Sequence, residues 1–210
     1  PDRNLSDLRA QMSANRLCVQ RMTDLCAKYG ADKVLAAGDA LQDYAERKMR
    51  TAIVAIPDGT YSFEDTFDSN QRPEGMTVKV DITVKGDEMT LAFDGPPQVR
   101  GGLNLIYTSL LAACYFTVKS VLDPTILPNA GLARPLKVTA PRGTILNCEH
   151  PAAVDGRIAA AQRVTDLVYG ALAKALPGKV MAAGNGCCTG AIFNGADDKG
   201  EIWVYLETIG

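Results

Sequence analysis

The stretch Asp123–Val154, DPTILPNAGLARPLKVTAPRGTILNCEHPAAV, decides how the rest of the chain can be arranged. Five prolines and two glycines, Gly131 and Gly143, punctuate it. Proline fixes φ and lacks a backbone N–H, whereas glycine tolerates left-handed geometry, so the stretch cannot be one long helix. We expect a shaped loop, a short strand at Leu136–Thr139, a turn at 141–143 and a second loop.

Regular elements are expected on both sides of this stretch. Apolar residues at intervals of three and four predict a helix from Leu5 to Tyr29 and a second helix that begins at Asp32. Because the link between them is short, we expect the two helices to pack as an antiparallel hairpin over residues 1–56. Strict alternation predicts a strand at Met76–Val84, the most regular member of a half-exposed antiparallel sheet. The other expected elements are strands at Thr60–Phe67, Glu88–Phe93, Lys179–Ala183 and Glu201–Ile209, a helix apolar on all sides at Asn104–Leu122, and a helix at Gly156–Leu176.

The predicted fold class is therefore α+β, with the helical hairpin at 1–56 and a mixed core at 57–210. The core combines an antiparallel β-hairpin region, a buried central helix under Pro/Gly-rich loops, and a further helix with strands. Hydrophobic content of 47% and charged content of 22% are ordinary for a globular protein. A net charge of -2 gives no reason to expect nucleic acid or an anionic membrane as partner.

Neither the apolar runs nor the cysteines indicate a membrane or a secreted protein. No apolar run reaches the roughly 18 residues of a membrane span, and the first residues do not form a secretory signal. The six cysteines show neither a disulfide framework nor the spacing of a zinc site. We interpret them as reduced thiols of a cytoplasmic protein, with Cys18 and Cys114 as small core residues.

Polar side chains in the loops are the candidate binding groups, because loops on a rigid scaffold concentrate such groups. Arg134 offers a planar fork to a carboxylate or carbonyl, but it could equally hold loop carbonyls together. The asparagines could instead bond their own backbone. The predicted substrate-binding residues are Asn104, Asn129, Arg134, Asn147 and Asn185.

Three groups are candidates for acid–base chemistry: Asp166, Glu207 and His150. Asp166 follows Gln162 by one turn on the same helix face, and Arg163 and Arg157 could pair with Asp166 or Asp155. His150 is the only histidine, so no two-histidine metal motif exists within this sequence, and a structural role is the alternative. The glycine-rich segment Gly184–Gly190 could face a substrate or anion, or could be a structural turn.

The motif PNAG-x-x-RP-x-x-V-x-x-P-x-G-T-x-x-N-x-x-x-PAAV resembles the hydantoinase B family, which includes subunits of hydantoinases, 5-oxoprolinase, lactamases and ketone carboxylases. Four further segments agree in order: NLSDLRAQ at 4–11, GGLN at 101–104, QRV-x-D at 162–166 and YLETIG at 205–210. The resemblance covers nearly the whole chain. Members are typically longer, so the resemblance implies an internal part of a larger B-type subunit.

The same resemblance implies ATP-dependent hydrolysis of a cyclic amide or imide. An A-type partner would bind ATP and Mg and phosphorylate the substrate, and the B-type component would assist hydrolysis at a divalent metal (Zn, Mn or Mg) held outside this segment. One alternative is a subunit of an ATP-dependent ketone carboxylase of the acetone or acetophenone type. The other is a structural segment without catalytic groups.

Overall fold

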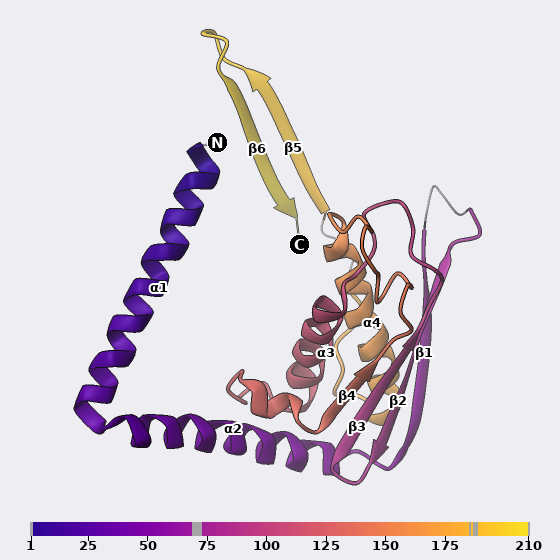
Figure 1. Cartoon of the computed structure of the whole chain (residues 1–210). Coiled ribbons are helices and arrows are strands. Elements are labelled where there is room, and N and C mark those ends of the chain that lie inside the picture. Colours follow the sequence, from indigo (N-terminus) through magenta and orange to yellow (C-terminus); the bar gives the residue numbers. More distant parts are fainter. Residues whose placement is uncertain (1, 69–72, 185, 187–188, 210) are drawn as a thin grey trace.

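The computed structural model describes residues 2–68, 73–184, 186 and 189–209. Two helices, α1 (Asp2–Tyr29) and α2 (Ala31–Val54), lead into a four-stranded sheet and two further helices (Figure 1). A separate pair of strands follows near the C-terminus. The remaining elements are β1 (Gly59–Phe67), β2 (Met76–Lys85), β3 (Glu88–Asp94), α3 (Tyr107–Leu122), η1 (Ala130–Ala133), β4 (Leu136–Thr139), α4 (Arg157–Ala175), β5 (Thr189–Ala196) and β6 (Ile202–Ile209).

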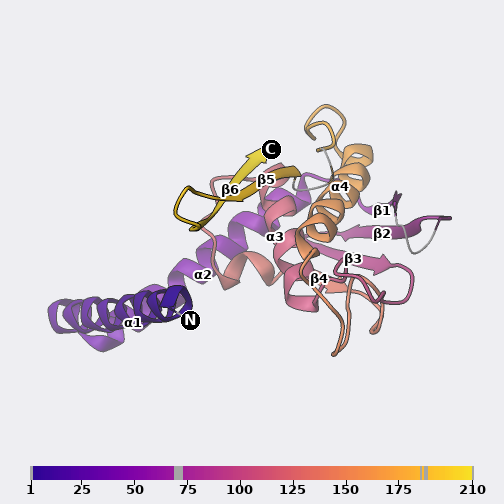
Figure 2. The same ribbon diagram turned by 90° about the horizontal axis from the view of Figure 1, so that it is seen from above.

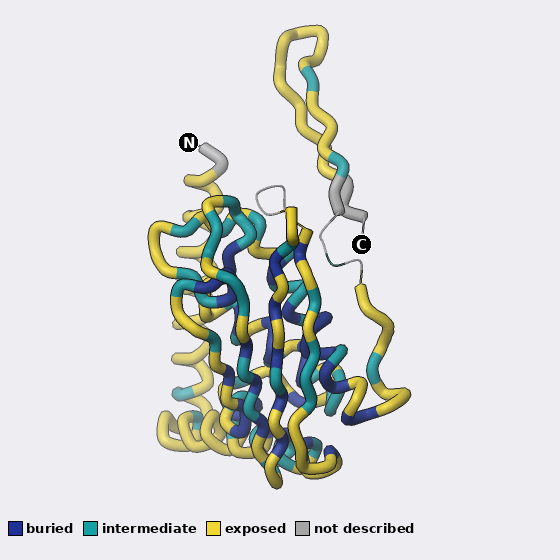
Figure 3. The backbone as a smooth tube through the Cα atoms, turned by 90° about the vertical axis from the view of Figure 1, so that its right-hand side faces the viewer, coloured by how far each residue is buried: buried dark blue, intermediate teal, exposed yellow. Residues whose placement is uncertain are grey.

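The main sheet has the strand order β1-β2-β3-β4, in which β4 joins parallel to β3 and the other neighbours are antiparallel. In β2, Met76, Val78, Val80, Ile82 and Val84 are buried, while the residues between them are more exposed. The helices α3 and α4 lie against the apolar side of the sheet, and Figure 3 shows the buried positions gathered in these two layers. The α+β fold class is confirmed.

The stretch around η1 and β4 has the predicted character. The strand Leu136–Thr139 is confirmed as β4, and Gly143 adopts a φ of 76° at the expected turn. Before β4 the chain forms the single 3-10 turn η1, whose preceding residue Asn129 accepts a hydrogen bond from the backbone N–H of Gly131. Each element in this stretch is short because a proline or glycine interrupts it.

Both N-terminal helices are confirmed, but their antiparallel packing is wrong. The chain turns at Gly30, with a φ of 87°, and α1 leaves α2 at a sharp corner, as Figure 1 shows. Figure 2 shows that α1 lies well away from the main sheet. Consequently the predicted apolar stripe of α1 is largely exposed, including Leu8 and Val19. Cys18, which was expected to be a small core residue, is exposed as well. Only the last turns of α2 enter the core, through Ala45, Met49 and Ile53.

Two further expectations are corrected. The helix predicted at Asn104–Leu122 begins at Tyr107, and it is not buried all round because Phe116 is 64% exposed. Residues Lys179–Ala183 form no strand, whereas β5, which was not predicted, follows the glycine-rich segment and pairs with β6. Within the described residues, no helix is long and apolar enough to cross a membrane.

Candidate functional site

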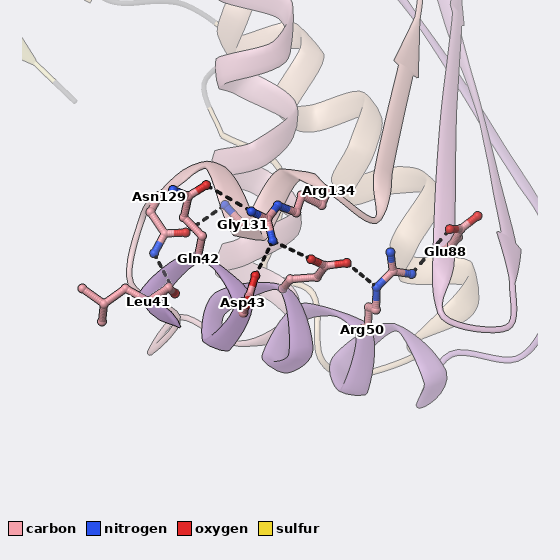
Figure 4. Close-up of polar contacts among 9 residues, drawn as sticks. Leu41, Gln42, Asp43, Arg50, Glu88, Asn129, Gly131 and Arg134 are labelled. Carbon is pink, nitrogen blue, oxygen red and sulfur yellow. Dashed lines mark hydrogen bonds and ion pairs between the residues drawn. The ribbon is translucent and has the colours of Figure 1, made fainter. Parts of the chain in front are cut away.

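The structure distributes the predicted site residues over three places instead of gathering them. Asn129 and Arg134 lie where η1 meets α2, as Figure 4 shows. Asn104 and Asn147 lie in the loops flanking α3 and β4. Asp166 lies on α4 beside the start of the glycine-rich segment. No single cavity therefore unites them within the described residues.

Arg134 is held by carboxylates of α2. Its Nη1 lies 2.7 Å from Asp43 Oδ1 and 2.9 Å from Glu46 Oε2, and Glu46 Oε1 also lies 2.9 Å from Arg50 Nε. The hydrogen bonds from Arg134 and then Arg50 hold the pKa of Glu46 below its usual value. Arg134 therefore fixes η1 to α2, and a substrate contact by its side chain stays a prediction.

Asn129 and Gly131 complete the contact with α2 (Figure 4). Asn129 Nδ2 donates to the carbonyl oxygen of Leu41 at 3.2 Å, while its Oδ1 accepts from Gly131 N at 2.9 Å. A Cβ on Gly131 would lie 1.9 Å from the carbonyl oxygen of Gln42. Glycine is thus required here by the close approach of two backbones.

Asn104 is fully buried and uses both ends of its amide. Its Oδ1 accepts from Val99 N at 2.8 Å, and its Nδ2 lies 2.8–2.9 Å from the carbonyl oxygens of Val99, Gly101 and Ala153. Two loops distant in sequence are joined by this one side chain. Its substrate-binding role stays a prediction, because these bonds already account for a buried amide.

Asn147 and His150 lie in the second of these loops. Asn147 Nδ2 donates to the carbonyl oxygen of Ala140 at 2.9 Å, which closes the turn at residues 141–146. His150 is exposed, beside Glu149, whose carboxylate pairs with Arg142 at 2.6 Å. Neither the binding role predicted for Asn147 nor the catalytic role predicted for His150 is tested by these contacts.

The polar groups of α4 lie against β1 and the glycine-rich segment. Asp166 is 9% exposed, and its Oδ1 accepts from the backbone N–H of Gly184 at 3.2 Å. Arg163 pairs with Asp65 of β1, and its guanidinium lies 5.7 Å from the ring centre of Phe67. Gly186 approaches the same guanidinium so closely that a Cβ there would lie 2.7 Å from Arg163 Nη2.

Asp65, the partner of Arg163, is a site residue that the sequence analysis did not predict. Arg163 pairs with it and not with Asp155 or Asp166, and Arg157 instead donates to the carbonyl oxygen of Val154. The available signal was that Glu64 and Asp65 interrupt the alternation of an otherwise regular strand. A charged residue on a packed strand needs a partner, but the arginine that supplies it lies 98 positions further along the chain.

Two side-chain polar atoms on this part of α4 are buried without a hydrogen-bond partner among the described residues: Gln162 Oε1 and Arg163 Nε. On the neighbouring side of α4, an open groove of about 320 Å³ runs between α3 and α4, lined by Leu105, Ser109, Phe116, Ile158, Gln162 and Thr165. A mostly apolar groove next to hydrogen-bonding groups is the usual composition of a small-molecule site. We define Asp65, Gln162, Arg163, Asp166 and Gly184 as the α4 cluster.

Two predicted residues cannot be assigned a contact. Asn185 lies outside the described residues, and Glu207 is described only through its backbone, which pairs with Ala191 between β6 and β5. Within the described part of the chain, no three His, Cys, Asp or Glu side chains gather as metal ligands. The proposed metal site outside this segment stays a prediction.

Comparison with known proteins identifies the family. Residues 1–210 match the model of the hydantoinase B/oxoprolinase family, and the chain belongs to that family. It is 34% identical over 216 residues to a protein of Pseudomonas sp. (strain NS671) that is provisionally named as the B subunit of a D-/L-hydantoinase, a match covering 97% of this chain and 36% of that protein. It is 29% identical over 206 residues to the beta subunit of caprolactamase from Pseudomonas jessenii, covering 97% of this chain and 35% of that protein.

The fold agrees with this assignment. The crystal structure of the ATP-dependent caprolactamase from Pseudomonas jessenii superposes with a TM-score of 0.80 at 27% identity, covering 97% of this chain and 35% of the other. The nucleotide-free acetone carboxylase superposes with a TM-score of 0.73 at 17% identity, covering 88% and 27%, and shares the fold alone. The chain thus spans about a third of the length of these curated relatives.

Proposed function

We propose that this chain forms part of the B-type subunit of an ATP-dependent hydrolase of cyclic amides or imides. The observation that carries the proposal is the family match over all 210 residues, together with the likeness to the caprolactamase in both sequence and fold. Relatives named as 5-oxoprolinases, such as the one from Saccharomyces cerevisiae at 28% identity, act on a cyclic amide by name and support the same substrate class.

The dependence on ATP follows from the chemistry of the amide bond. Resonance makes an amide carbonyl a poor electrophile, and phosphorylation of its oxygen turns that oxygen into part of a leaving group. An A-type partner would transfer the γ-phosphoryl group of ATP, with Mg, to the carbonyl oxygen and release ADP. Water then attacks the activated carbon, the ring C–N bond breaks as the nitrogen takes a proton, and a second water hydrolyses the acyl phosphate to the carboxylate and inorganic phosphate. The B-type component would hold the phosphorylated intermediate while water attacks.

We assign the α4 cluster as this chain's contribution to the wall of the substrate cavity. Asp166 is a nearly buried carboxylate beside a glycine-rich backbone, which suits a group that accepts a proton or orients an N–H. The ion pair of Arg163 with Asp65 fixes the helix face on which Asp166 lies. Arg134, Asn129, Asn104 and Asn147 instead shape the loops around the core.

The metal and the ATP chemistry would come from outside this segment. We propose that residues outside this segment bind the divalent metal. The partners are the A-type subunit and the other parts of the B-type subunit, in the cytoplasm. This assignment would make the chain one wall of a site completed by other polypeptide.

The proposal is tested with a hybrid in which these 210 residues replace the aligned 35% of the beta subunit of caprolactamase. The hybrid is purified with its companion subunit and examined by native mass spectrometry, metal analysis and caprolactam-dependent ADP release. We expect an assembled complex that contains metal and releases ADP with ring-opened product. A hybrid that assembles with metal but opens no cyclic amide among caprolactam, 5-oxoproline and hydantoins would contradict the proposal.

A further inference from the structure

The strands β5 and β6 form a hairpin that stands apart from the main sheet, as Figure 1 shows. Its sequence differs from that of β2, which alternates apolar and polar residues and is buried on one face only. From Ile202 to Leu206, IWVYL, every residue of β6 is apolar or aromatic. Alternation is typical of a strand with one solvated face, whereas a continuous apolar run is typical of a strand buried on both faces.

The register assigns these residues to two faces. Ile202, Val204 and Leu206 share one face with Ile192 of β5, and this aliphatic face is 58–80% exposed. Trp203 and Tyr205 share the other face with Phe193, and this aromatic face is 47–54% exposed. Large apolar side chains are therefore exposed on both sides of the same hairpin.

The local geometry makes the aromatic face an ordered surface. The rings of Phe193 and Tyr205 lie with centres 6.2 Å apart. Trp203 lies over the backbone of its pair partner Gly195, where a Cβ would come within 2.9 Å of the indole. Glycine at 195 thus lets the indole approach the neighbouring strand closely.

The charged residues of this hairpin, apart from Glu207 near the end of β6, gather at its tip. Asp197, Asp198, Lys199 and Glu201 lie in or beside the turn, and Asp197 accepts hydrogen bonds from the backbone N–H groups of Lys199 and Glu201. No charged side chain lies in the strands from Ala191 to Ala196 and from Ile202 to Leu206. The tip is polar, whereas the strand segments 191–196 and 202–206 carry apolar side chains on both faces, apart from Asn194 and the hydroxyl group of Tyr205.

The two strands pair with each other only, within the described part of the chain. Two-stranded hairpins have marginal stability in water without further strands or a covering layer. A second copy of the hairpin packed face to face would cover one of its faces and leave the other in water. A partner that covers the hairpin fully must therefore supply one apolar layer against each of its two faces.

We propose that β5–β6 is an interior strand pair of a larger sheet, inserted between two apolar layers supplied by the portion of a B-type subunit outside these 210 residues. The inference rests on the proposed B-type assignment. The longer part of each curated relative lies outside the match, since this chain covers 36% and 35% of them, so polypeptide of sufficient size is present in the relatives. The hairpin thus joins this chain to the rest of the subunit.

The single tryptophan of the chain, Trp203, provides the readout. In the chain alone, we expect a monomer by sedimentation whose tryptophan emission is that of a hydrated indole and is quenched by acrylamide. In the caprolactamase hybrid, hydroxyl-radical footprinting should show Trp203 and Val204 protected at least fivefold relative to the chain alone. A blue-shifted, unquenched monomer would mean that the hairpin folds onto its own core, and would overturn the inference.

Substitutions on the two faces test whether both are covered. Val204→Lys and Phe193→Lys should each reduce the yield of assembled hybrid at least tenfold while leaving the thermal transition of the chain alone unchanged, because both side chains are exposed there. Asp198→Lys at the tip is the matched control and should assemble normally. If only one of the two lysine substitutions reduces assembly, only one face of the hairpin is covered, and the proposed insertion between two layers is wrong.

Three other outcomes would identify a different occupant or separate the insertion of the hairpin from the proposed function. A chain that dimerises and becomes monomeric with Val204→Lys would identify a second copy as the occupant, against the inference. A hybrid that opens the lactam with Trp203 still unprotected would overturn the inference and leave the proposed function standing. Protection of Trp203 in a hybrid without turnover would support the insertion and contradict the function.

Discussion

Asn104 is the residue on which the loops around α3 depend most. Its buried amide bonds the backbone N–H of Val99 and the carbonyl oxygens of Gly101 and Ala153. Removing the amide would leave these backbone groups without their hydrogen-bond partner. We expect Asn104→Ala to lower the free energy of unfolding by about 2–4 kcal/mol. Chemical denaturation measures this, and Asn15→Ala on the exposed helix α1 should change it by less than about 0.5 kcal/mol.

Equal, small effects of the two asparagine substitutions would contradict this account of Asn104. An unchanged stability combined with lost activity of the hybrid would instead support the predicted substrate contact. The sequence placed Asn104 after two glycines and marked it as a binding group. It could not reveal the bond to residue 153, because that partner lies 49 positions away and depends on how two loops meet.

Asp166 is the carboxylate whose chemistry is most directly testable. Asparagine keeps the oxygen that accepts from Gly184 but cannot exchange a proton at pH 7. If Asp166 is a general acid or base, Asp166→Asn should lower kcat of the hybrid about 10²–10⁴-fold and remove one limb of its pH profile, with stability nearly unchanged. A matched change, Asp24→Asn on the exposed helix α1, should leave kcat and the profile intact.

A loss of stability with Asp166→Asn and an unaltered pH profile would show that the carboxylate only holds the glycine-rich segment.

The pairing of Arg163 with Asp65 could not be predicted from the spacing of residues along one helix. Spacing along α4 suggested partners on the same helix or just before it. The actual partner comes from β1, because α4 packs on that strand, and only the tertiary fold determines this.

The contact between η1 and α2 requires a glycine at position 131. Alanine at Gly131 would push its Cβ against the backbone of Gln42, so Gly131→Ala should cost about 1–3 kcal/mol of unfolding free energy. Gly38→Ala, in the exposed interior of α2 with no atom within 4 Å of the new Cβ, should stabilise by about 0.5–1 kcal/mol. Thermal denaturation of both variants checks the opposite signs, and a neutral Gly131→Ala would be inconsistent with the close approach.

A second link to α2 predicts a pH dependence. Lys48 Nζ lies 2.8 Å from Asp123 Oδ2, and this hydrogen bond, with those from Thr125, lowers the pKa of Asp123 to about 2. Because the folded-state pKa is below the ordinary value of 3.8, the contribution to stability is complete above about pH 4 and is lost as pH falls towards 2. The pair is solvent-accessible, so the effect is modest.

Comparing the wild type with Asp123→Asn by denaturation at pH 7 and at pH 2 measures this link. The wild type should be the more stable protein at pH 7, and the difference should shrink at pH 2. A difference that is constant across this range would show that Asp123 acts through its hydrogen bonds to Thr125 and not through its charge.

The elements that the sequence predicted correctly share one property. Their hydrophobic pattern is set by residues that lie close together in the chain. The alternation of β2 and the apolar spacing of α4 both correspond to faces that are buried in the fold. The direction of α1 and the pairing of β5 with β6 were not predictable in this way. The glycine at position 30 is compatible with both a hairpin and a corner between α1 and α2. The glycines around β5 are typical of a loop, so they gave no indication of a strand.

At the scale of the whole molecule, the exposed surfaces agree with a part of a larger assembly. The apolar positions of α1 and both faces of the β5–β6 hairpin are exposed, while the sheet with α3 and α4 forms a complete core (Figure 3). Exposed apolar surfaces of this extent mark interaction sites. The family resemblance was readable from the motif around residues 128–154, but the interaction surfaces needed the structure.

Product analysis of the hybrid distinguishes hydrolysis of a cyclic amide from carboxylation of a ketone. The caprolactamase hybrid with its companion subunit is incubated with ATP and either caprolactam or acetone, with and without bicarbonate, and the products are identified by mass spectrometry. We expect one ring-opened amino acid per lactam consumed, formed equally well without bicarbonate. A carboxylated product that requires bicarbonate, with no ring opening, would contradict it and identify a carboxylase.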